Sequence, residues 1–355
     1  MASTSRPERT AESAAGPSAA SPSATGPSAA RVADPSMPAS EATARAIALV
    51  AERRGPAESL GRSLAELVNE PDAFVLAIRR GFTELADPEY LDGQRRVAPG
   101  IGAVHGVRWP LLAAVARGFR RATTGERATP MLFVAGRLFG EPELEYRWFA
   151  FGLLERTLDR ETERTWQLLR RAAREAGDWI TVDSLAHPYG TGIAREVYRW
   201  AELEQLIYSP SRWERRLVGS TIATMTHGRR RAGRDPELPG RALVLLAQLM
   251  GDAEPDVQKA LSWAYRSLAQ IDPEATAAAL EDETGRTSAT ADGHRAWVIR
   301  DSLSKLDPAV ADRLRDRLVG IRKRPGAPAT SLAAETSSRF GALPDPATHP
   351  EPPLS

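Results

Sequence analysis

The chain has 355 residues, and its 47 basic side chains are almost balanced by 46 acidic ones, which leaves a formal net charge of +1. The absence of cysteine excludes a disulfide scaffold, a cysteine-ligated metal site and a thiol nucleophile. With only five histidines, we expect no metal centre. No apolar run approaches the roughly 20 residues of a membrane-spanning helix, and we find no signal peptide, so we expect a soluble, cytoplasmic protein.

Both ends of the chain are poor in bulky apolar side chains. Residues 1–40 consist mainly of Ala, Ser, Pro, Gly and Thr, and residues 325–355 have a similar Pro-rich composition. Such segments cannot bury enough apolar surface to offset the entropy cost of ordering. We therefore predict disordered tails at 1–40 and 325–355 and one folded body at 41–324, whose net charge is about +3.

The body shows apolar residues at helical spacing almost throughout, and no sustained alternation of the kind that strands show. Ser40 is placed to cap the first helix, and several later helices begin with Pro in the first turn, where no amide hydrogen is needed. The fold class is therefore all-α. We predict helices at 41–54, 110–123, 142–158, 162–176, 212–226, 236–250, 255–268 and 308–322.

The order of these helices favours a repeat architecture. Two-helix units of the HEAT and armadillo type take about 40–47 residues, so about six or seven units would fit in the body. Such units stack on one another and form a curved solenoid with an extended concave surface. A compact, irregular helical bundle is the alternative.

Three segments carry residues that could act on a ligand. In the first, Trp179 and Asp183 are four residues apart and share one face of a helix, while Val182, Leu185 and Ala186 can pack against the body. We expect the Trp–Asp pair to face outward. Taken alone, a Trp of this kind is more often a core residue, and an Asp is more often solvated or a cap.

The second segment is rich in arginine. Between Arg212 and Asp235 only two acidic residues stand against seven arginines, which gives a local positive excess that the whole-chain charge conceals. A solvated charge run is the alternative interpretation. The seven arginines are Arg212, Arg215, Arg216, Arg229, Arg230, Arg231 and Arg234.

In the third segment, Lys259, Trp263 and Arg266 follow one another at helical spacing, beside a buried stripe that includes Val257 and Leu261. Two cations that flank an indole are typical of a face that contacts the phosphate–sugar backbone. A cation–π contact within the protein would explain the same pattern.

Together these segments resemble the AlkD-type DNA alkylation-repair glycosylases, which are built from HEAT-like repeats. The most specific match is the run from Val257 to Arg266, and the resemblance covers about residues 106–306. The family often has a second Trp before the one matched by Trp179 and an acidic residue after it, whereas this chain has Asp178 and Ile180. The matching segments are Gly106–Pro110, Arg147–Leu154, Trp179–Ser184, Trp213–Arg216 and Val257–Arg266.

The resemblance implies a DNA glycosylase that acts on duplex DNA with alkylated purines, without metal or cofactor and as a monomer. Asp183, Trp179 and Trp263 would be its catalytic residues, in a basic cleft on the concave surface. A cationic N3- or N7-alkylated purine leaves as a neutral base, so the positive charge that develops on the deoxyribose needs stabilisation by a carboxylate and by indole faces. The expected DNA contacts are Arg216, Arg215, Arg212, Lys259, Arg266 and Arg108.

The alternative is a noncatalytic helical-repeat protein that binds DNA structures or protein partners. Because the Trp179–Asp183 pair is present, we favour the glycosylase. His187 and His227 each stand alone near a helix end, so we expect them to be solvated or capping. We expect Glu145 to be an ordinary surface charge.

Overall fold

The computed structural model describes residues 40–98, 100–227 and 235–339. These ranges hold sixteen α-helices and no strand, which confirms the all-α prediction. None of the described helices combines the length and the apolar character that crossing a membrane would require. The predicted tails lie largely outside the described residues, at 1–39 and 340–355.

All eight predicted helices are present, and the ends of six of them lie within two residues of the prediction, whereas the first helix continues to Glu66 and the last ends earlier, at Arg317. The first half of the chain contains α1 (Glu41–Glu66), α2 (Pro71–Leu85), α3 (Pro88–Val97), α4 (Trp109–Ala122), α5 (Ala128–Leu138), α6 (Leu144–Thr157), α7 (Thr162–Glu175) and α8 (Trp179–Arg195). The second half contains α9 (Trp200–Leu206), α10 (Arg212–His227), α11 (Leu238–Leu249), α12 (Pro255–Leu268), α13 (Pro273–Thr290), α14 (Gly293–Ser302), α15 (Pro308–Arg317) and α16 (Leu332–Arg339).

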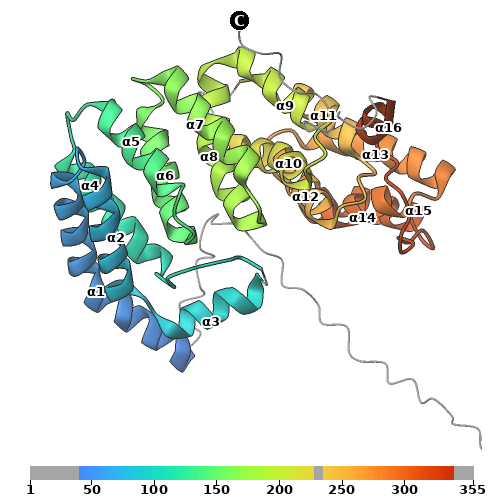
Figure 1. The fold of residues 1–355 in the computed structure, drawn as a ribbon. Coiled ribbons are helices and arrows are strands. Elements are labelled where there is room, and N and C mark those ends of the chain that lie inside the picture. Colours follow the sequence, from blue (N-terminus) through green and yellow to red (C-terminus); the bar gives the residue numbers. More distant parts are fainter. Residues whose placement is uncertain (1–39, 99, 228–234, 340–355) are drawn as a thin grey trace, which may run out of the picture.

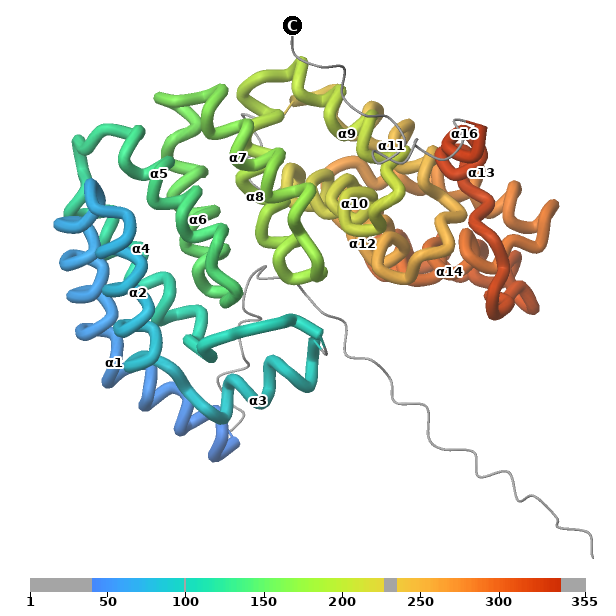
Figure 2. The backbone as a smooth tube through the Cα atoms, viewed as in Figure 1, coloured from blue at the N-terminus to red at the C-terminus, as the bar shows by residue number. Residues whose placement is uncertain are grey.

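The helices form two layers that follow one another along an arc. In one layer, α4, α6, α8, α10, α12 and α14 each pack against the next, and in the other layer α5 contacts α7 and α13 contacts α11 and α15. Helix pairs such as α5–α6 and α7–α8 join the two layers. The arc is open on one side, with α1–α3 at one end and α13–α16 at the other (Figures 1 and 2). This arrangement is the predicted helical-repeat solenoid rather than the irregular bundle.

Helix α1 continues beyond Arg54, where the sequence prediction ends it, and passes through Pro56 to Glu66. Its contact with α4 explains why. A Cβ atom built on Gly61 would lie 2.1 Å from the Val115 carbonyl oxygen, and one on Gly118 would lie 2.1 Å from that of Glu58. The two glycines therefore let the helix backbones touch, and this packing outweighs the hydrogen bond that a proline inside a helix removes.

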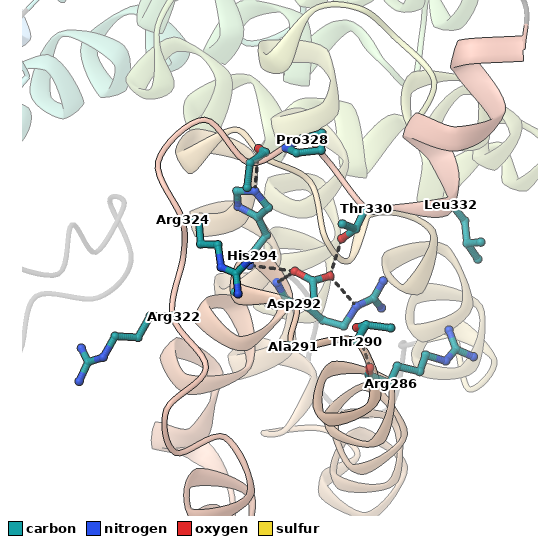
Figure 3. A pocket seen from close by; sticks show the side chains of 13 residues that line it. Arg286, Thr290, Ala291, Asp292, His294, Arg322, Arg324, Pro328, Thr330 and Leu332 are labelled. Carbon is teal, nitrogen blue, oxygen red and sulfur yellow. Dashed lines mark hydrogen bonds and ion pairs between the residues drawn. The ribbon is translucent and has the colours of Figure 1, made fainter.

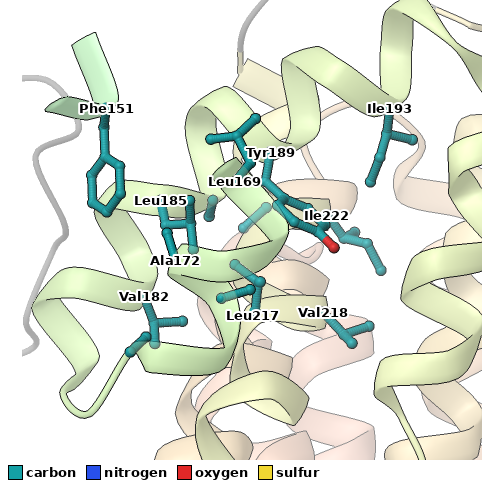
Figure 4. Packing of buried hydrophobic residues seen from close by; sticks show 14 of the residues in the cluster. Phe151, Leu169, Ala172, Val182, Leu185, Tyr189, Ile193, Leu217, Val218 and Ile222 are labelled. Carbon is teal, nitrogen blue, oxygen red and sulfur yellow. The ribbon is translucent and has the colours of Figure 1, made fainter. Parts of the chain in front are cut away.

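The apolar core continues through the middle of the arc and fixes α8 between its neighbours. Figure 4 shows Val182 and Leu185 of α8 facing Leu217 and Val218 of α10, and all four side chains are at most 1% exposed. Burial of each such side chain contributes roughly 1.5–3 kcal/mol to folding. Because this core holds one face of α8, the polar side chains of its first turns take a defined position between α6 and α10.

The folded body extends beyond residue 324, where the sequence analysis begins the C-terminal tail. The backbone N–H of Thr330 donates to the Gly251 carbonyl at 2.9 Å, and the Thr330 hydroxyl donates to Asp292. His294 bonds the Ala327 carbonyl at 3.1 Å, and α16 packs against α11. Figure 3 shows this segment passing over the start of α14, where it lines a cavity of about 640 Å³. Contacts between residues 33 to 79 positions apart in the chain are not visible in the composition.

Candidate active site

Helix α8 begins at Trp179 because Asp178 caps it. The Asp178 carboxylate accepts hydrogen bonds from the backbone N–H of Thr181 at 2.7 Å and from its hydroxyl at 2.6 Å. A carboxylate at this position satisfies a free amide and complements the positive end of the helix dipole. The cap sets the start of the helix, so Trp179 and Asp183 lie on the same side, one turn apart.

The side chain of Asp183 points into the protein and is only 6% exposed. Arg216 of α10 donates to it twice, from Nε to Oδ1 at 3.0 Å and from Nη2 to Oδ2 at 2.8 Å. The Ser220 hydroxyl donates to Oδ1 at 2.6 Å. The expectation that Asp183 faces outward is therefore corrected, because α10 packs directly against this side of α8.

Three of the four hydrogen-bonding positions of the Asp183 carboxylate are filled within the protein. A carboxylate offers about four lone-pair sites, two on each oxygen. Arg216 and Ser220 fill both sites on Oδ1 and one on Oδ2. Among the described residues, no second donor to Oδ2 is present.

Arg216 connects the three helices that surround the carboxylate. In addition to Asp183 on α8, its Nη1 donates to the Asp256 carbonyl at 2.7 Å, in the first turn of α12. Its guanidinium carbon lies 5.9 Å from the ring centre of Trp179. The sequence analysis expects Arg216 to contact DNA, which needs an accessible guanidinium. In the structure its side chain is only 6% exposed and holds the carboxylate beside the indole.

The positive excess predicted for α10 is reduced by acidic residues that lie between α11 and α12 and in the first turn of α12. Arg215 pairs with Asp252 at 2.7 Å, and Arg212 lies 3.7 Å from Asp256 and 4.7 Å from the ring centre of Trp213. Because these acidic partners come just before α12 or in its first turn, a count over residues 212–235 cannot include them. The other four arginines of this run, Arg229, Arg230, Arg231 and Arg234, lie outside the described residues.

The three predicted contact residues of α12 differ in exposure. Lys259 is exposed, whereas Trp263 and Arg266 are half-buried. Among the described residues, Lys259 is exposed and has no ion-pair partner, whereas Arg266 pairs with Asp301 at 2.6 Å. Trp263 is half-buried and packs against the main apolar core. No described hydrogen bond or ring contact joins Trp263 to Asp183 or Trp179, and α10 lies between their helices.

Arg108, the remaining predicted DNA contact, is held at the other end of the arc. Its Nε donates to Asp87 at 2.5 Å, and its guanidinium carbon lies 5.0 Å from the ring centre of Tyr90. Burial alone would raise the pKa of Asp87, but the hydrogen bond and charge of Arg108, with two backbone N–H groups, lower it below its usual value. Arg108 therefore joins α3 to the start of α4.

Glu145 is fully buried, which corrects the expectation of a surface charge. Its carboxylate accepts hydrogen bonds from the backbone N–H groups of His105, Gly106 and Val107 at 2.8–3.1 Å. Gly106 has a φ of +83°, a conformation that favours glycine. Glu145 thus fixes the loop before α4. The glycine at position 106 is the only sequence signal for a tight turn at this loop.

Ser220 is the site residue that the sequence analysis does not name. It follows Arg216 by four residues, so the two side chains share a face of α10, and this spacing could have identified it. The resulting group is a buried carboxylate with a fixed orientation, one turn of helix from an indole, and with three donors among the described residues. Such a group can orient a water molecule and stabilise a nearby cation. Among the described residues, no cluster of three or more His, Asp or Glu side chains could hold a metal ion.

A protein-family model matches the whole segment that carries the predicted site residues. The family model described as DNA alkylation repair enzyme matches residues 78–306, which is more than half of the chain and includes every predicted site residue. No curated protein matches the sequence. On the strength of the family match, the chain belongs to the DNA alkylation repair enzyme family.

Proposed function

We propose that the protein is a DNA glycosylase that hydrolyses the bond between deoxyribose and a cationic N3- or N7-alkylated purine in duplex DNA. The glycosidic bond breaks, and its electron pair leaves with the purine, which becomes neutral. The deoxyribose becomes an oxocarbenium ion, to which water adds at C1′ and then loses a proton. The leaving base is already activated by its positive charge, so the reaction needs neither a general acid nor a cofactor.

The observation that carries this proposal is the Asp183 carboxylate. It is buried, and its orientation is fixed by Arg216 and Ser220, yet within the described part of the chain one lone pair on Oδ2 has no partner. Asp183 lies in the second turn of α8 and caps nothing, so capping does not account for its burial. A preorganised charge of this kind stabilises a developing cation better than solvent does.

Two indoles supplement this charge in the proposed mechanism. Trp179 stands one turn before Asp183 and is half-buried, so part of its electron-rich face is available to a cationic sugar or base. Trp263 would act from α12, on the far side of α10. Lys259, the exposed cation of the same helix, would contact a phosphate, and the protein would act as a monomer.

The same proposal includes purines that carry bulky adducts. The resemblance implies an open site that holds the DNA backbone and leaves the damaged base largely stacked, which differs from enzymes that turn the base into a pocket. The residues that flank Trp179 here, Asp178 and Ile180, differ from those that the family often has. Asp178 is the cap of α8, so its side chain does not occupy the site.

A noncatalytic DNA-binding protein is the second candidate, and the pairing of Asp183 with Arg216 is the observation that favours it. A buried, bidentate ion pair can have a purely structural role, in which it joins helices and takes no part in a reaction. In that case Asp183 would have no role in base release, and the exposed Lys259 and its neighbours would provide DNA affinity alone.

The test is incubation of the purified protein with duplex DNA that contains N7-methylguanine or N3-methyladenine, followed by chromatography of the freed bases. We expect release of methylated purines by the wild type and a large loss in Asp183→Asn, whose side chain keeps its shape and loses its charge. Affinity for the same duplex should persist in this variant. Binding without base release by the wild type would support the noncatalytic candidate.

A further inference from the structure

Three consecutive cations follow α15, in a segment that lies beyond the end of the family match. These residues are Arg322, Lys323 and Arg324, and no acidic residue occurs in the sequence between Val319 and Ala334. Arg322 and Arg324 are exposed, and Lys323 is half-buried. Figure 3 shows Arg322 and Arg324 on the loop that passes the start of α14.

One face of α14 fixes this segment in place. Gly293, Trp297 and Arg300 share that face because they follow one another at spacings of four and three residues. A Cβ atom built on Gly293 would lie 2.2 Å from the Arg322 carbonyl oxygen, so the glycine lets the segment lie directly on the helix. Arg300 donates from Nη2 to the Ile321 carbonyl at 2.6 Å. The fold therefore determines where the backbone of the three cations runs.

Lys323 connects the segment to α12. Its ammonium nitrogen lies 4.3 Å from the ring centre of Trp297 and donates to the side-chain oxygen of Gln258, which is fully buried. Gln258 directly precedes Lys259, the exposed lysine of α12. Burial lowers the pKa of Lys323, and the charge of Lys259 lowers it further. The two lysines therefore lie close enough to repel each other.

The positive charges of this surface are not neutralised within the described part of the chain. A second like-charge contact is present here, because burial lowers the pKa of Arg300 and the charge of Arg322 lowers it further. Like charges held together in this way weaken the fold unless an anion from outside neutralises them. The cations for which the described residues provide no ion pair are Lys259, Arg322, Lys323 and Arg324.

We propose that Arg322, Lys323 and Arg324 contact the phosphate backbone of duplex DNA and, with Lys259, form one phosphate-contact surface at the C-terminal end of the arc. The four cations are spread over α12 and the segment after α15, so they match phosphates spaced along a backbone better than one small anion. The proposal rests on the DNA binding in the proposed function but not on base release. It extends the DNA-contact surface beyond the part of the chain that the family model matches.

This surface would act on affinity rather than on the reaction itself. Contacts to phosphates away from the lesion are equally strong in the ground state and in the transition state. Loss of these contacts should therefore raise the apparent KM for methylated duplex and leave kcat nearly unchanged.

The experiment measures the affinity for an undamaged duplex by fluorescence anisotropy over a range of salt concentrations. Arg322→Ala/Arg324→Ala removes two exposed side chains, so the fold should be unaffected. Affinity should fall by on the order of 10- to 100-fold at low salt, and the slope of log K against log salt should decrease by about two. The matched control is Arg120→Ala/Arg127→Ala, which removes two exposed arginines on α4 and just before α5 and should leave the slope unchanged.

A second variant tests the half-buried member of the surface. Lys323→Met keeps an unbranched side chain over Trp297 and removes the charge. The salt slope should decrease by about one, as expected for the loss of a single phosphate contact. Urea unfolding checks that the variant is folded under the conditions of the binding measurement.

An unchanged salt slope in both variants would overturn the proposal, and so would an equal decrease in the control. Stabilisation of the wild type by inorganic phosphate, combined with unchanged DNA affinity in the variants, would assign the cations to a small anion instead. Because the binding measurement uses undamaged duplex, it decides this proposal even if the wild type releases no methylated base, a result that would contradict only the glycosylase function.

Discussion

Two buried aspartates in this protein illustrate different uses of the same side chain. Asp292 caps α14, and all four of its hydrogen-bonding positions are filled, by the backbone N–H groups of His294 and Arg295, by the Arg295 side chain and by Thr330. Asp183 is equally buried but lies inside α8, where it caps nothing, and the described residues fill only three of its positions.

The difference lies in what each carboxylate is needed for. Asp292 satisfies amides that the start of a helix leaves without partners and fastens the C-terminal segment through Thr330, as Figure 3 shows. Its position is therefore accounted for by folding alone. Asp183 takes its described partners from another helix, 33 and 37 residues further along the chain, and lies one turn of helix after Trp179. Asp292 therefore has a structural role, and in the proposed mechanism Asp183 is the carboxylate that stabilises the sugar cation.

The largest expected effect on stability comes from Arg216→Ala. The change leaves the Asp183 carboxylate buried without its bidentate partner, which should lower the free energy of unfolding by about 3–5 kcal/mol. Urea unfolding measures this loss. In the double variant Asp183→Asn/Arg216→Ala the two losses should be clearly less than additive, because they remove one interaction. Additive losses would show that the pair is not coupled.

Ser220→Ala and Thr330→Val compare the neutral donors of the two aspartates. Each removes one hydroxyl that donates to a buried carboxylate, so each should cost about 1–3 kcal/mol in urea unfolding. Only Ser220→Ala should also slow base release, since it removes one of the three hydrogen bonds that orient the Asp183 carboxylate. If Thr330→Val slowed base release as strongly, the distinction between the two carboxylates would fail.

Acid should weaken the Asp292 contacts. Burial alone would raise the pKa of Asp292, but hydrogen bonds from Thr330 and Arg295 and the Arg295 charge lower it. The stabilisation is therefore present above the pKa of the unfolded chain, about 4, and disappears as the pH falls through the lower folded value. The difference in unfolding free energy between wild type and Asp292→Asn should shrink on acidification below about pH 4. A difference that is constant down to pH 2 would contradict this.

The smallest effect is expected from Lys259→Ala, because Lys259 is exposed and unpaired among the described residues. Stability should not change, but DNA affinity should fall, and the slope of log K against log salt should decrease by about one. Lys305→Ala, which removes another exposed lysine, is the control. An unchanged slope for Lys259→Ala would exclude a phosphate contact.

The helical framework could be predicted because its signals are local. Ser40 accepts a hydrogen bond from the Thr43 N–H, as expected for a cap, and the helix at Pro255–Leu268 has the predicted ends. The spacing of apolar residues and a Pro at the first helical position determine where such helices begin and end, and both signals lie within a few residues of the ends. Where a distant contact decides, as at Pro56 in α1, the local pattern ends the helix too early.

The structure brings together three of the predicted site residues, whereas Trp263 lies on the far side of α10 and Arg108 pairs with Asp87. Spacing and resemblance point to Trp179, Asp183 and Arg216, but they do not predict the ion pair between the last two, which lie on different helices. The same holds for Arg215 with Asp252. Charge partners that meet across neighbouring helix pairs leave no pattern in a single sequence, so the arginines of α10 looked freer than they are.

The most direct test of the central claim is single-turnover release of N7-methylguanine by Asp183→Asn and by Asp292→Asn, each at a temperature at which urea unfolding shows it to be fully folded. Removal of a preorganised charge at a reaction centre costs on the order of 10²–10³-fold in rate, so Asp183→Asn should fall by that factor. Asp292→Asn should release the base at the wild-type rate. Wild-type release by Asp183→Asn, or an equal loss in both variants, would contradict the assignment of Asp183 as the stabilising carboxylate.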